Sequence, residues 1–164
     1  MPIVSLDKAG IAIAISLLAC MGFTSYISYN QRKEASAYPR SATIQTASGS
    51  NIATVEVQTS KEGQRIGLSG RSSISPGSGM LFPVKPAKLV KVWMKDMRFP
   101  IDILFVKDNR VIQVVEKAPP CKTTEACPRY MSESPVDTII ELHPDTEVKV
   151  GTELKIMYTV ANKE

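Results

Sequence analysis

The sequence predicts a mainly β fold: a single β-sandwich or small barrel with one short helix, preceded by an N-terminal membrane-spanning or signal helix. Three observations support this prediction. Short segments with strand-like patterns follow one another from residue 51 onward, and eleven Pro and nine Gly break the chain into short elements. No long helical segments alternate with these strands, as a parallel α/β fold would require. Residues 9–29, in contrast, form an uncharged apolar run.

Length and composition are those of one globular domain with appendages. The chain has 164 residues, of which 43% are hydrophobic and 22% are charged. It carries 20 basic and 16 acidic side chains, which gives a net charge of +4. Proteins that bind nucleic acids usually show a denser basic stripe or a recognisable motif, so we expect no nucleic-acid partner.

Residues 1–29 are predicted to be a signal anchor or a signal peptide. The run Ala9–Tyr29 is long enough to cross a hydrocarbon core of about 30 Å. Three alternatives are open: an uncleaved anchor, a lipoprotein signal in which Cys20 is lipidated, and cleavage after the A-x-A pattern Ala35–Ala37. Each of them addresses the protein to a membrane or anchors it there, and none makes this segment part of the fold.

Charges and cysteines give opposite indications of the side of the membrane. Only Lys8 precedes the apolar run, whereas three basic residues follow it, so the positive-inside rule places the C-terminal domain in the cytoplasm. The pair Cys121 and Cys127 lies in a Pro-flanked, loop-like segment, which favours a structural disulfide formed in an oxidising compartment over two free thiols. Their spacing does not match a zinc site. We therefore expect an anchored or exported protein whose domain is extracytoplasmic.

A tether is predicted to connect the N-terminal segment to the β domain. Residues 30–50 are rich in Ser, Ala and Thr and show no sustained periodicity, as is typical of a flexible linker. The β domain is then expected over residues 51–164. Its first strand is predicted at residues 53–58, where Val55 and Val57 share one face.

A short helix and a loop are predicted next. Thr59–Glu62 matches the S/T-x-x-E capping box, so a helix is expected to run to about Leu68. Gly63 lowers the stability of this helix by about 1 kcal/mol relative to Ala. The turn residues in segment 69–79 predict a loop.

The remaining chain predicts six more strands and one long loop. The turn signal at Asp108-Asn109 indicates a hairpin between two of the strands. A loop that contains the cysteine pair is expected over residues 118–135. The strands are predicted at Met80–Val84, Lys88–Lys95, Ile101–Lys107, Val111–Glu116, Val136–Leu142 and Glu153–Val160.

Several motifs in this domain resemble the domain of unknown function 192 family over about residues 52–156. The family pattern GLM-x-R, GMLF, FWMKNT and PLDILF corresponds here to GLSGR at Gly67–Arg71, GMLF at Gly79–Phe82, VWMKDM at Val92–Met97 and PIDILF at Pro100–Phe105. The chain departs from the pattern at Ser69, where Met is usual, and at Asp96-Met97, where Asn-Thr is usual. The resemblance implies a mainly β, jelly-roll-like sandwich, often behind a signal sequence. It implies no reaction, because the family has no established activity.

The central motif supplies most of the candidate site residues. Strand alternation places Lys91, Trp93 and Lys95 on one face and Val92 and Met94 on the other. One interpretation makes Trp93 the floor of a pocket that would suit a sugar, a carboxylate or a lipid headgroup. The alternative makes Trp93 a core residue beside a structural ion pair between Lys95 and Asp102. The binding candidates are Arg71, Trp93, Lys95, Asp102, Glu116 and Glu141.

A basic run crosses the same region and also allows two interpretations. It consists of Lys85, Lys88, Lys91, Lys95 and Arg98. Such a run is usually a solvated face. Its functional alternative is contact with anionic lipid or polysaccharide near the anchoring membrane.

Catalytic motifs are not evident. The one histidine, His143, has no nucleophile beside it in the sequence, and GLSG is not a nucleophile elbow. A carboxylate pair for glycoside hydrolysis could come from several acids, among them Glu116, Glu133, Asp137 and Glu141. We expect no catalytic residue, cofactor or metal. The prediction is therefore a binding or accessory module whose partners are the membrane, through the N-terminal segment, and a small ligand or an envelope protein. A small hydrolase acting on envelope carbohydrate is the alternative.

Overall fold

The structure, a computed structural model, describes residues 24–25, 40–121 and 127–159. The chain divides into two compact units, Met1–Tyr38 and Pro39–Glu164, and the second contains the β domain. The predicted anchor or signal, with Cys20 and the A-x-A pattern, lies outside the described residues except for Thr24 and Ser25. Within the described residues, no helix is both long enough and apolar enough to cross a membrane.

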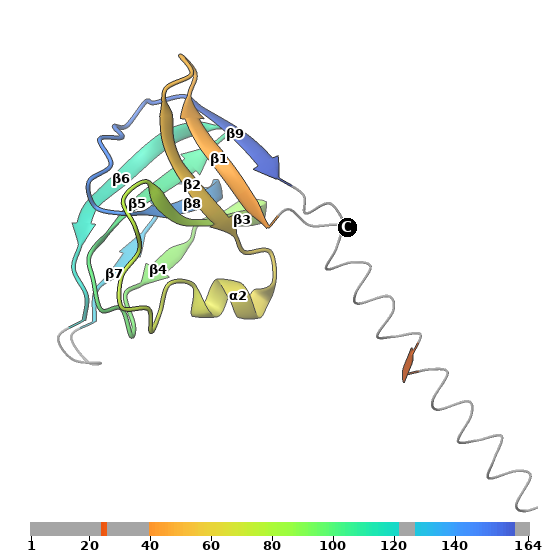
Figure 1. The fold of residues 1–164 in the computed structure, drawn as a ribbon, viewed down its shortest axis with the longest axis vertical. Helices are drawn as coiled ribbons and strands as arrows, with labels where there is room; N and C mark the ends of the chain where they lie inside the picture. Colours follow the sequence, from red (N-terminus) through yellow and green to blue (C-terminus); the bar gives the residue numbers. More distant parts are fainter. Residues whose placement is uncertain (1–23, 26–39, 122–126, 160–164) are drawn as a thin grey trace, which may run out of the picture. The chain divides into compact units, whose positions relative to one another are not determined.

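Seven strands of the described region form one sheet, in the order β6-β5-β8-β3-β2-β1-β9 (Figure 1). Neighbouring strands are antiparallel except for β2 and β3, which are parallel and are connected through the helix α2 (Lys61–Ile66). A parallel pair needs such a crossover because the chain must return to the end at which it started. The strands are β1 (Ser41–Thr46), β2 (Asn51–Val57), β3 (Ser78–Lys88), β5 (Ile101–Lys107), β6 (Arg110–Ala118), β8 (Val136–Leu142) and β9 (Leu154–Thr159).

The sheet curls around an inner hydrophobic core to which all seven strands contribute. The core includes Ile44, Val55, Leu81, Leu104, Ile140 and Leu154. At one corner the two edge strands approach each other, because Arg110 bridges to Glu153 and the backbone N–H of Leu154 donates to the carbonyl of Asn109. The fold is therefore a curled half-barrel, closer to the small-barrel prediction than to a jelly-roll sandwich of two stacked sheets.

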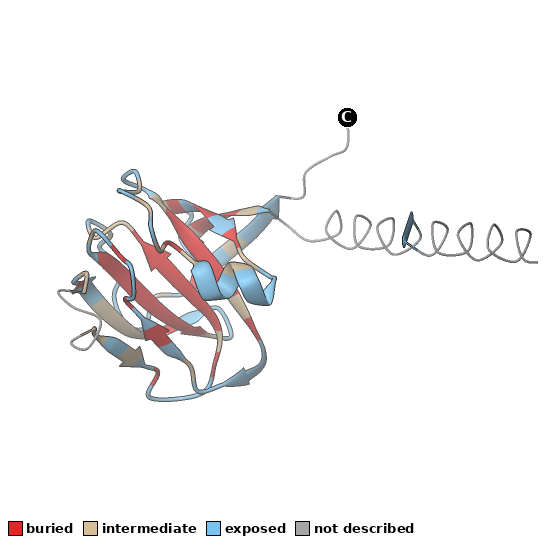
Figure 2. Cartoon of the chain, turned by 90° about the horizontal axis from the view of Figure 1, so that it is seen from below, coloured by how far each residue is buried: buried red, intermediate tan, exposed pale blue. Residues whose placement is uncertain are grey.

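A second core lies on the other face of the central strands. It includes Met80 and Phe82 of β3, Ile103 and Phe105 of β5, and Ile139 of β8. β5, β8 and the first part of β3, up to Val84, are buried on both faces. Figure 2 shows buried residues in red along the strands of the domain. A two-stranded ribbon of β4 (Lys91–Trp93) and β7 (Arg129–Met131) contributes to this second core. Both cores consist of residues 42–154, so Pro39–Glu164 has a hydrophobic interior of its own.

Several predicted elements agree with the structure. The bounds of β5 and β8 are those predicted, and β2 buries Val55 and Val57 on one face. β5 and β6 form the predicted hairpin, in which Asp108 and Asn109 adopt φ values of 49° and 60°. Two consecutive residues with positive φ are typical of a type I′ turn, which matches the twist of the flanking strands.

Two strands lie where the sequence predicts none. β1 falls inside the predicted tether, which is therefore too long at its C-terminal end, and β7 falls inside the predicted loop 118–135. β1 buries only Ala42 and Ile44, and β7, with three residues, is too short to show an alternating pattern. β3 extends beyond the prediction to Lys88, whereas β4 is shorter than its predicted span of 88–95.

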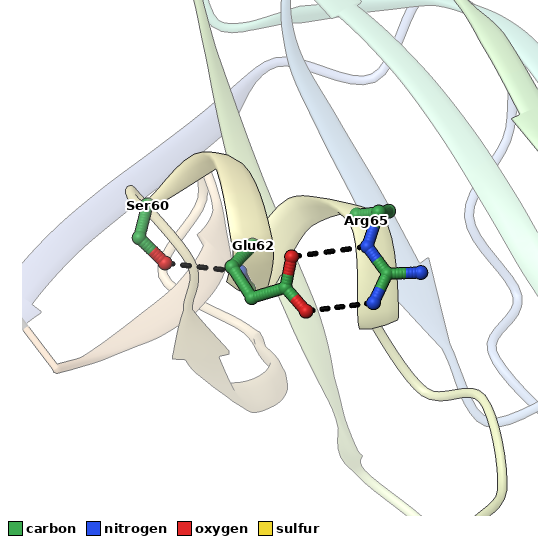
Figure 3. A network of polar contacts seen from close by, with 4 residues as sticks. Ser60, Glu62 and Arg65 are labelled. Carbon is green, nitrogen blue, oxygen red and sulfur yellow. Dashed lines mark hydrogen bonds and ion pairs between the residues drawn. The ribbon is translucent and has the colours of Figure 1, made fainter.

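The helix α2 is shorter than predicted and begins one residue later. Ser60, not Thr59, is the N-cap, and its Oγ accepts a hydrogen bond from the backbone N–H of Gly63 at 2.9 Å (Figure 3). Glu62 does not complete a capping box. It pairs with Arg65 instead, and Arg65 Nη2 lies 2.7 Å from Glu62 Oε1. Gly67, at φ 53°, ends the helix. None of the helical residues is buried, so α2 is a surface connection and not part of either core.

Candidate functional site

The outer face of the β4–β7 ribbon carries the central motif. The register pairs Lys91 with Met131 and Trp93 with Arg129, so these four side chains share one face. Val92 lies on the opposite face and is buried, as is Met94, whereas Lys91, Trp93 and Lys95 are exposed. The predicted division of this strand into two faces is therefore confirmed.

Trp93 is an exposed aromatic between two cations. Its side chain is 39% exposed, so the interpretation of Trp93 as a core residue is wrong. The guanidinium of Arg129 lies 4.4 Å from the centre of the indole ring, and the ammonium of Lys95 lies 5.4 Å from it. Both distances are within the range of cation–π attraction, which holds the ring and the two cations in one group.

The predicted basic run is exposed along its whole length. Lys85, Lys88, Lys91, Lys95 and Arg98 are all exposed, and within the described part of the chain none of them forms an ion pair. Two exposed acids accompany these cations: Asp96 within the basic run and Glu133 just after β7. Unpaired cations beside an exposed indole can contact an anionic group without first breaking an internal salt bridge.

The loop that follows α2 positions Lys95 and Asp96. Ser69 Oγ donates to the carbonyl of Lys95 at 2.8 Å, and the N–H of Gly70 donates to the carbonyl of Asp96 at 2.9 Å. Leu68 anchors the loop in the second core. Asp96 adopts φ 58°, a left-handed conformation that Asp and Asn tolerate better than most residues. Asp in place of the family's usual Asn is therefore compatible with this turn.

Arg71 does not join the Trp93 group. Its Nη1 and Nη2 donate to the two carboxylate oxygens of Glu56 at 2.6 and 2.7 Å, which ties the loop to β2. Hydrogen bonding to Arg71 lowers the pKa of the Glu56 carboxyl below its ordinary value. Arg71 is therefore a structural partner of Glu56 and not the rim of a pocket around Trp93.

The disulfide Cys121–Cys127 is formed, as predicted. Both cysteines pack against the second core. The residue after Cys127, Pro128, accepts a hydrogen bond from the N–H of Met94 at 3.2 Å, and Arg129 then begins β7. The disulfide thus restrains the chain immediately before Arg129, which contacts Trp93.

Removing this disulfide is expected to lower the free energy of unfolding by about 2 kcal/mol, since it closes a short ring. We expect the Cys121→Ser/Cys127→Ser variant to unfold at lower urea concentration than the oxidised wild type. Reduction of the wild type should reproduce the shift, and reduction of the variant should not. Equal midpoints for oxidised and reduced wild type would contradict this expectation.

Asp102 is a buried structural carboxylate and not a partner of Lys95. Two residues of β6, Glu116 and Lys117, lie opposite the single residue Asp102 of β5. This extra residue forms a β-bulge, in which Lys117 adopts φ 48°. Asp102 is 2% exposed, and its Oδ1 accepts a hydrogen bond from the N–H of Lys117 at 2.7 Å. Burial raises the pKa of its carboxyl, and backbone N–H groups of Lys117 and Thr146 oppose this by donating to it. Asp102 therefore joins β5 to the bulge and to the loop after β8.

Glu141 is a second buried acid, and its carboxylate has no partner among the residues that the structure describes. It lies on β8 between Met80 of β3 and Ile103 of β5 and is 8% exposed. Within the described residues its carboxylate makes no hydrogen bond or ion pair, and burial raises its pKa to about 7. A Cβ atom placed on Gly67 would stand 4.0 Å from Glu141 Oε2, so the carboxylate lies beneath the end of α2.

The predicted site residues are therefore dispersed. Trp93 and Lys95 lie together, but Arg71 binds Glu56, Asp102 binds the bulge, and Glu141 is buried elsewhere. Because Asp102 pairs with Leu142, the neighbour of Glu141, the two buried acids point to opposite faces of the sheet. They do not form the facing carboxylate pair of a glycosidase.

Glu116 is exposed near Asp102. Among the described residues, no three His, Cys, Asp or Glu side chains are grouped to hold a metal.

Arg129 is the site residue that the sequence did not single out. It stands after the cysteine pair in a segment predicted as loop, far in sequence from Trp93. The only local indication of a strand there is the segment Arg129–Met131. Three residues are too few to predict a strand or the strand that pairs with it.

Comparisons with known proteins identify relatives of the fold. The sequence model of the family described as DUF192, Uncharacterized ACR, matches residues 43–156. No curated protein matches the chain. A crystal structure from Sinorhizobium meliloti 1021, described as a proposed transcription regulator, is 28% identical with a TM-score of 0.62, over 73% of this chain and 94% of that one. A protein of unknown function from Novosphingobium aromaticivorans DSM 12444 is 23% identical with a TM-score of 0.60, over 70% and 83%.

Proposed function

The chain belongs to the DUF192 family of uncharacterized proteins, and from this premise we propose that its β domain is a non-catalytic binding or accessory module at the extracytoplasmic face of a membrane. The observation that carries the proposal is the group of Trp93, Lys95 and Arg129 on the β4–β7 ribbon. An exposed indole supplies apolar contact area, and the two cations supply donors for an anion. The ligand class is therefore an anion with an apolar or ring-shaped part.

The buried acids support a binding role over hydrolysis. Asp102 is occupied by backbone donors, and Glu141 lies on the opposite face of the sheet. A hydrolase would need an acid that reaches the bound ligand, and the buried carboxylates of Asp102 and Glu141 do not provide one at the ribbon surface.

The extracytoplasmic location is supported by the disulfide and by the apolar run Ala9–Tyr29. Disulfides persist in oxidising compartments and are rare in the cytosol. The run is long enough to hold the protein at a membrane. Labelling of the cysteines in intact cells, with and without prior reduction, tests the location: modification only after reduction supports it.

Trp93 is the chain's one tryptophan, so its fluorescence tests the site directly. We expect soluble anions with apolar parts, such as glucuronides, to shift or quench Trp93 emission. Arg129→Gln should weaken this response about tenfold, because a charge-assisted hydrogen bond is lost. Lys61→Gln is the matched control, since Lys61 is exposed on α2 and has no ion-pair partner among the described residues.

Two outcomes would count against the proposal. Turnover of a carbohydrate by the purified chain would contradict the non-catalytic role. Saturable binding of duplex DNA at Trp93, with no response to other anions, would instead favour the regulatory role named for the S. meliloti structure.

A further inference from the structure

Exposed apolar side chains accompany the cations of the β4–β7 ribbon. Leu89 is 55% exposed, Met131 is 52% exposed and Trp93 is 39% exposed. Met131 lies opposite Lys91, and Arg129 lies opposite Trp93. Directly opposed residues share a face, so Met131 and Trp93 are both on the outer face of the ribbon. Large exposed apolar residues are costly on a solvated face, and their grouping indicates a surface that becomes covered.

Leu89 lies next to the same ribbon. The N–H of Val90 donates to Ser132 Oγ, and the N–H of Ser132 donates to the carbonyl of Val90, both at 3.0 Å. These bonds continue the pairing of β4 with β7 by one residue. Leu89 therefore stands exposed next to this paired position, two residues before Lys91.

The cations of this surface are spread out and do not converge on one point. Lys88 ends β3, Lys91 begins β4 and Lys95 lies in the turn after β4, so the three lysines occupy three separate positions along the chain. Arg129 adds a fourth cation across the ribbon. One small anion contacts only part of such a row, whereas a surface with many anionic groups contacts all of it.

We propose that the β4–β7 ribbon docks flat on an anionic lipid bilayer. This inference rests on the proposed function and names the partner of the same site. Leu89, Trp93 and Met131 enter the interface between headgroups and acyl chains, the depth that indole rings prefer, while the lysines and Arg129 contact lipid phosphates. Asp96 and Glu133 are the nearest acids in these segments, so the surface keeps a net positive charge.

The test uses the full chain with phosphatidylcholine vesicles, with and without phosphatidylglycerol. Both vesicles offer the same apolar core to the N-terminal segment, and Trp93 emission reports on the ribbon and not on the basic residues that follow that segment. We expect Trp93 emission to shift to the blue, and to be quenched by brominated acyl chains, only with phosphatidylglycerol. High salt should reverse both effects, because exposed charges are screened.

A triple variant measures the contribution of the cations. Lys88→Gln/Lys91→Gln/Lys95→Gln should lower the partitioning of the ribbon onto phosphatidylglycerol vesicles, measured by Trp93 quenching, roughly a hundredfold, at about fivefold for each basic residue near the surface. The matched control, Lys61→Gln/Lys149→Gln/Lys155→Gln, makes the same change in net charge at exposed lysines of α2, the loop before β9 and β9, and its Trp93 should be quenched like that of the wild type. Leu89→Ser/Met131→Ser should reduce the brominated-lipid quenching.

The outcomes separate the two proposals. Equal Trp93 emission with both vesicles, together with a response to glucuronides, overturns lipid docking and leaves the binding module in place. No response to either overturns both. Equal loss of partitioning in the triple variant and its control shows that net charge alone acts, and also overturns docking through the ribbon.

Discussion

Replacing Asp102 with alanine is expected to lower the free energy of unfolding by about 3 kcal/mol, because a buried carboxylate that accepts backbone hydrogen bonds is lost. The N–H groups of Lys117 and Thr146 would be left without this acceptor. Lys117 also has a positive φ, which is disfavoured for a long side chain unless its surroundings hold it. Urea denaturation measures the loss. Hydrogen exchange at Lys117 of β6 and at Thr146 of the loop after β8 should accelerate more than at the other amides of these two segments.

Two further variants make this result specific. Asp102→Asn keeps one acceptor oxygen and should cost about 1 kcal/mol. Glu116→Ala removes an exposed carboxylate from the same bulge and should change stability by about 0.5 kcal/mol or less. If Asp102→Ala and Glu116→Ala have equal stability, or if exchange at Lys117 is unchanged, Asp102 does not stabilise the bulge as described.

Glu141 is expected to make the protein less stable as the pH rises from about 4.5 to about 7. The carboxyl has a pKa of about 7 in the folded protein, against 4.5 for an ordinary Glu. Between these values the unfolded chain releases the proton while the folded protein retains it, so increasing pH favours unfolding. The loss is roughly 3 kcal/mol, at about 1.4 kcal/mol for each pH unit, and stability should not fall further above pH 7 from this group.

Glu141→Gln separates this effect from the titration of other groups. The variant is neutral at every pH, so we expect it to lose most of the decrease between pH 5 and pH 8 and to exceed the wild type in stability at pH 8. Glu147→Gln, at an exposed position, is the control and should keep the wild-type profile. A Glu141→Gln profile parallel to that of the wild type would contradict the assignment.

The parts of the fold that could be predicted are those whose own residues determine them. β5 is a near-continuous apolar run and β8 is rich in β-branched residues, and the observed bounds of both strands are those predicted. The Asp108-Asn109 turn and the division of Lys91–Lys95 into two faces follow from residue type and from alternation along a strand. β1 and β7 could not be predicted, because pairing with β2, β9 and β4 stabilises them more than their own apolar content does.

The candidate site shows the same division. Trp93 and Lys95 could be paired from the sequence, since they lie two residues apart on one strand. Arg129 reaches Trp93 only because β7 pairs with β4 next to the disulfide. The opposite charges of Lys95 and Asp102 predict an ion pair between them. In the fold, backbone N–H groups donate to the buried Asp102 carboxylate instead. Charge complementarity in a sequence does not show which partner lies nearer.

The sequence by itself determined the β class, the family, the disulfide partners and the faces of the central strand. These properties depend on composition, on the spacing of residues along one strand and on a single cysteine pair outside the apolar run. Only the tertiary structure decided that the sheet curls into a half-barrel, that Trp93 is exposed between Arg129 and Lys95, and that Asp102 and Glu141 face opposite sides. The physical reason is that the exposure of a side chain and its electrostatic partners depend on contacts between strands that are distant in sequence. The residue pattern within one strand does not specify these contacts.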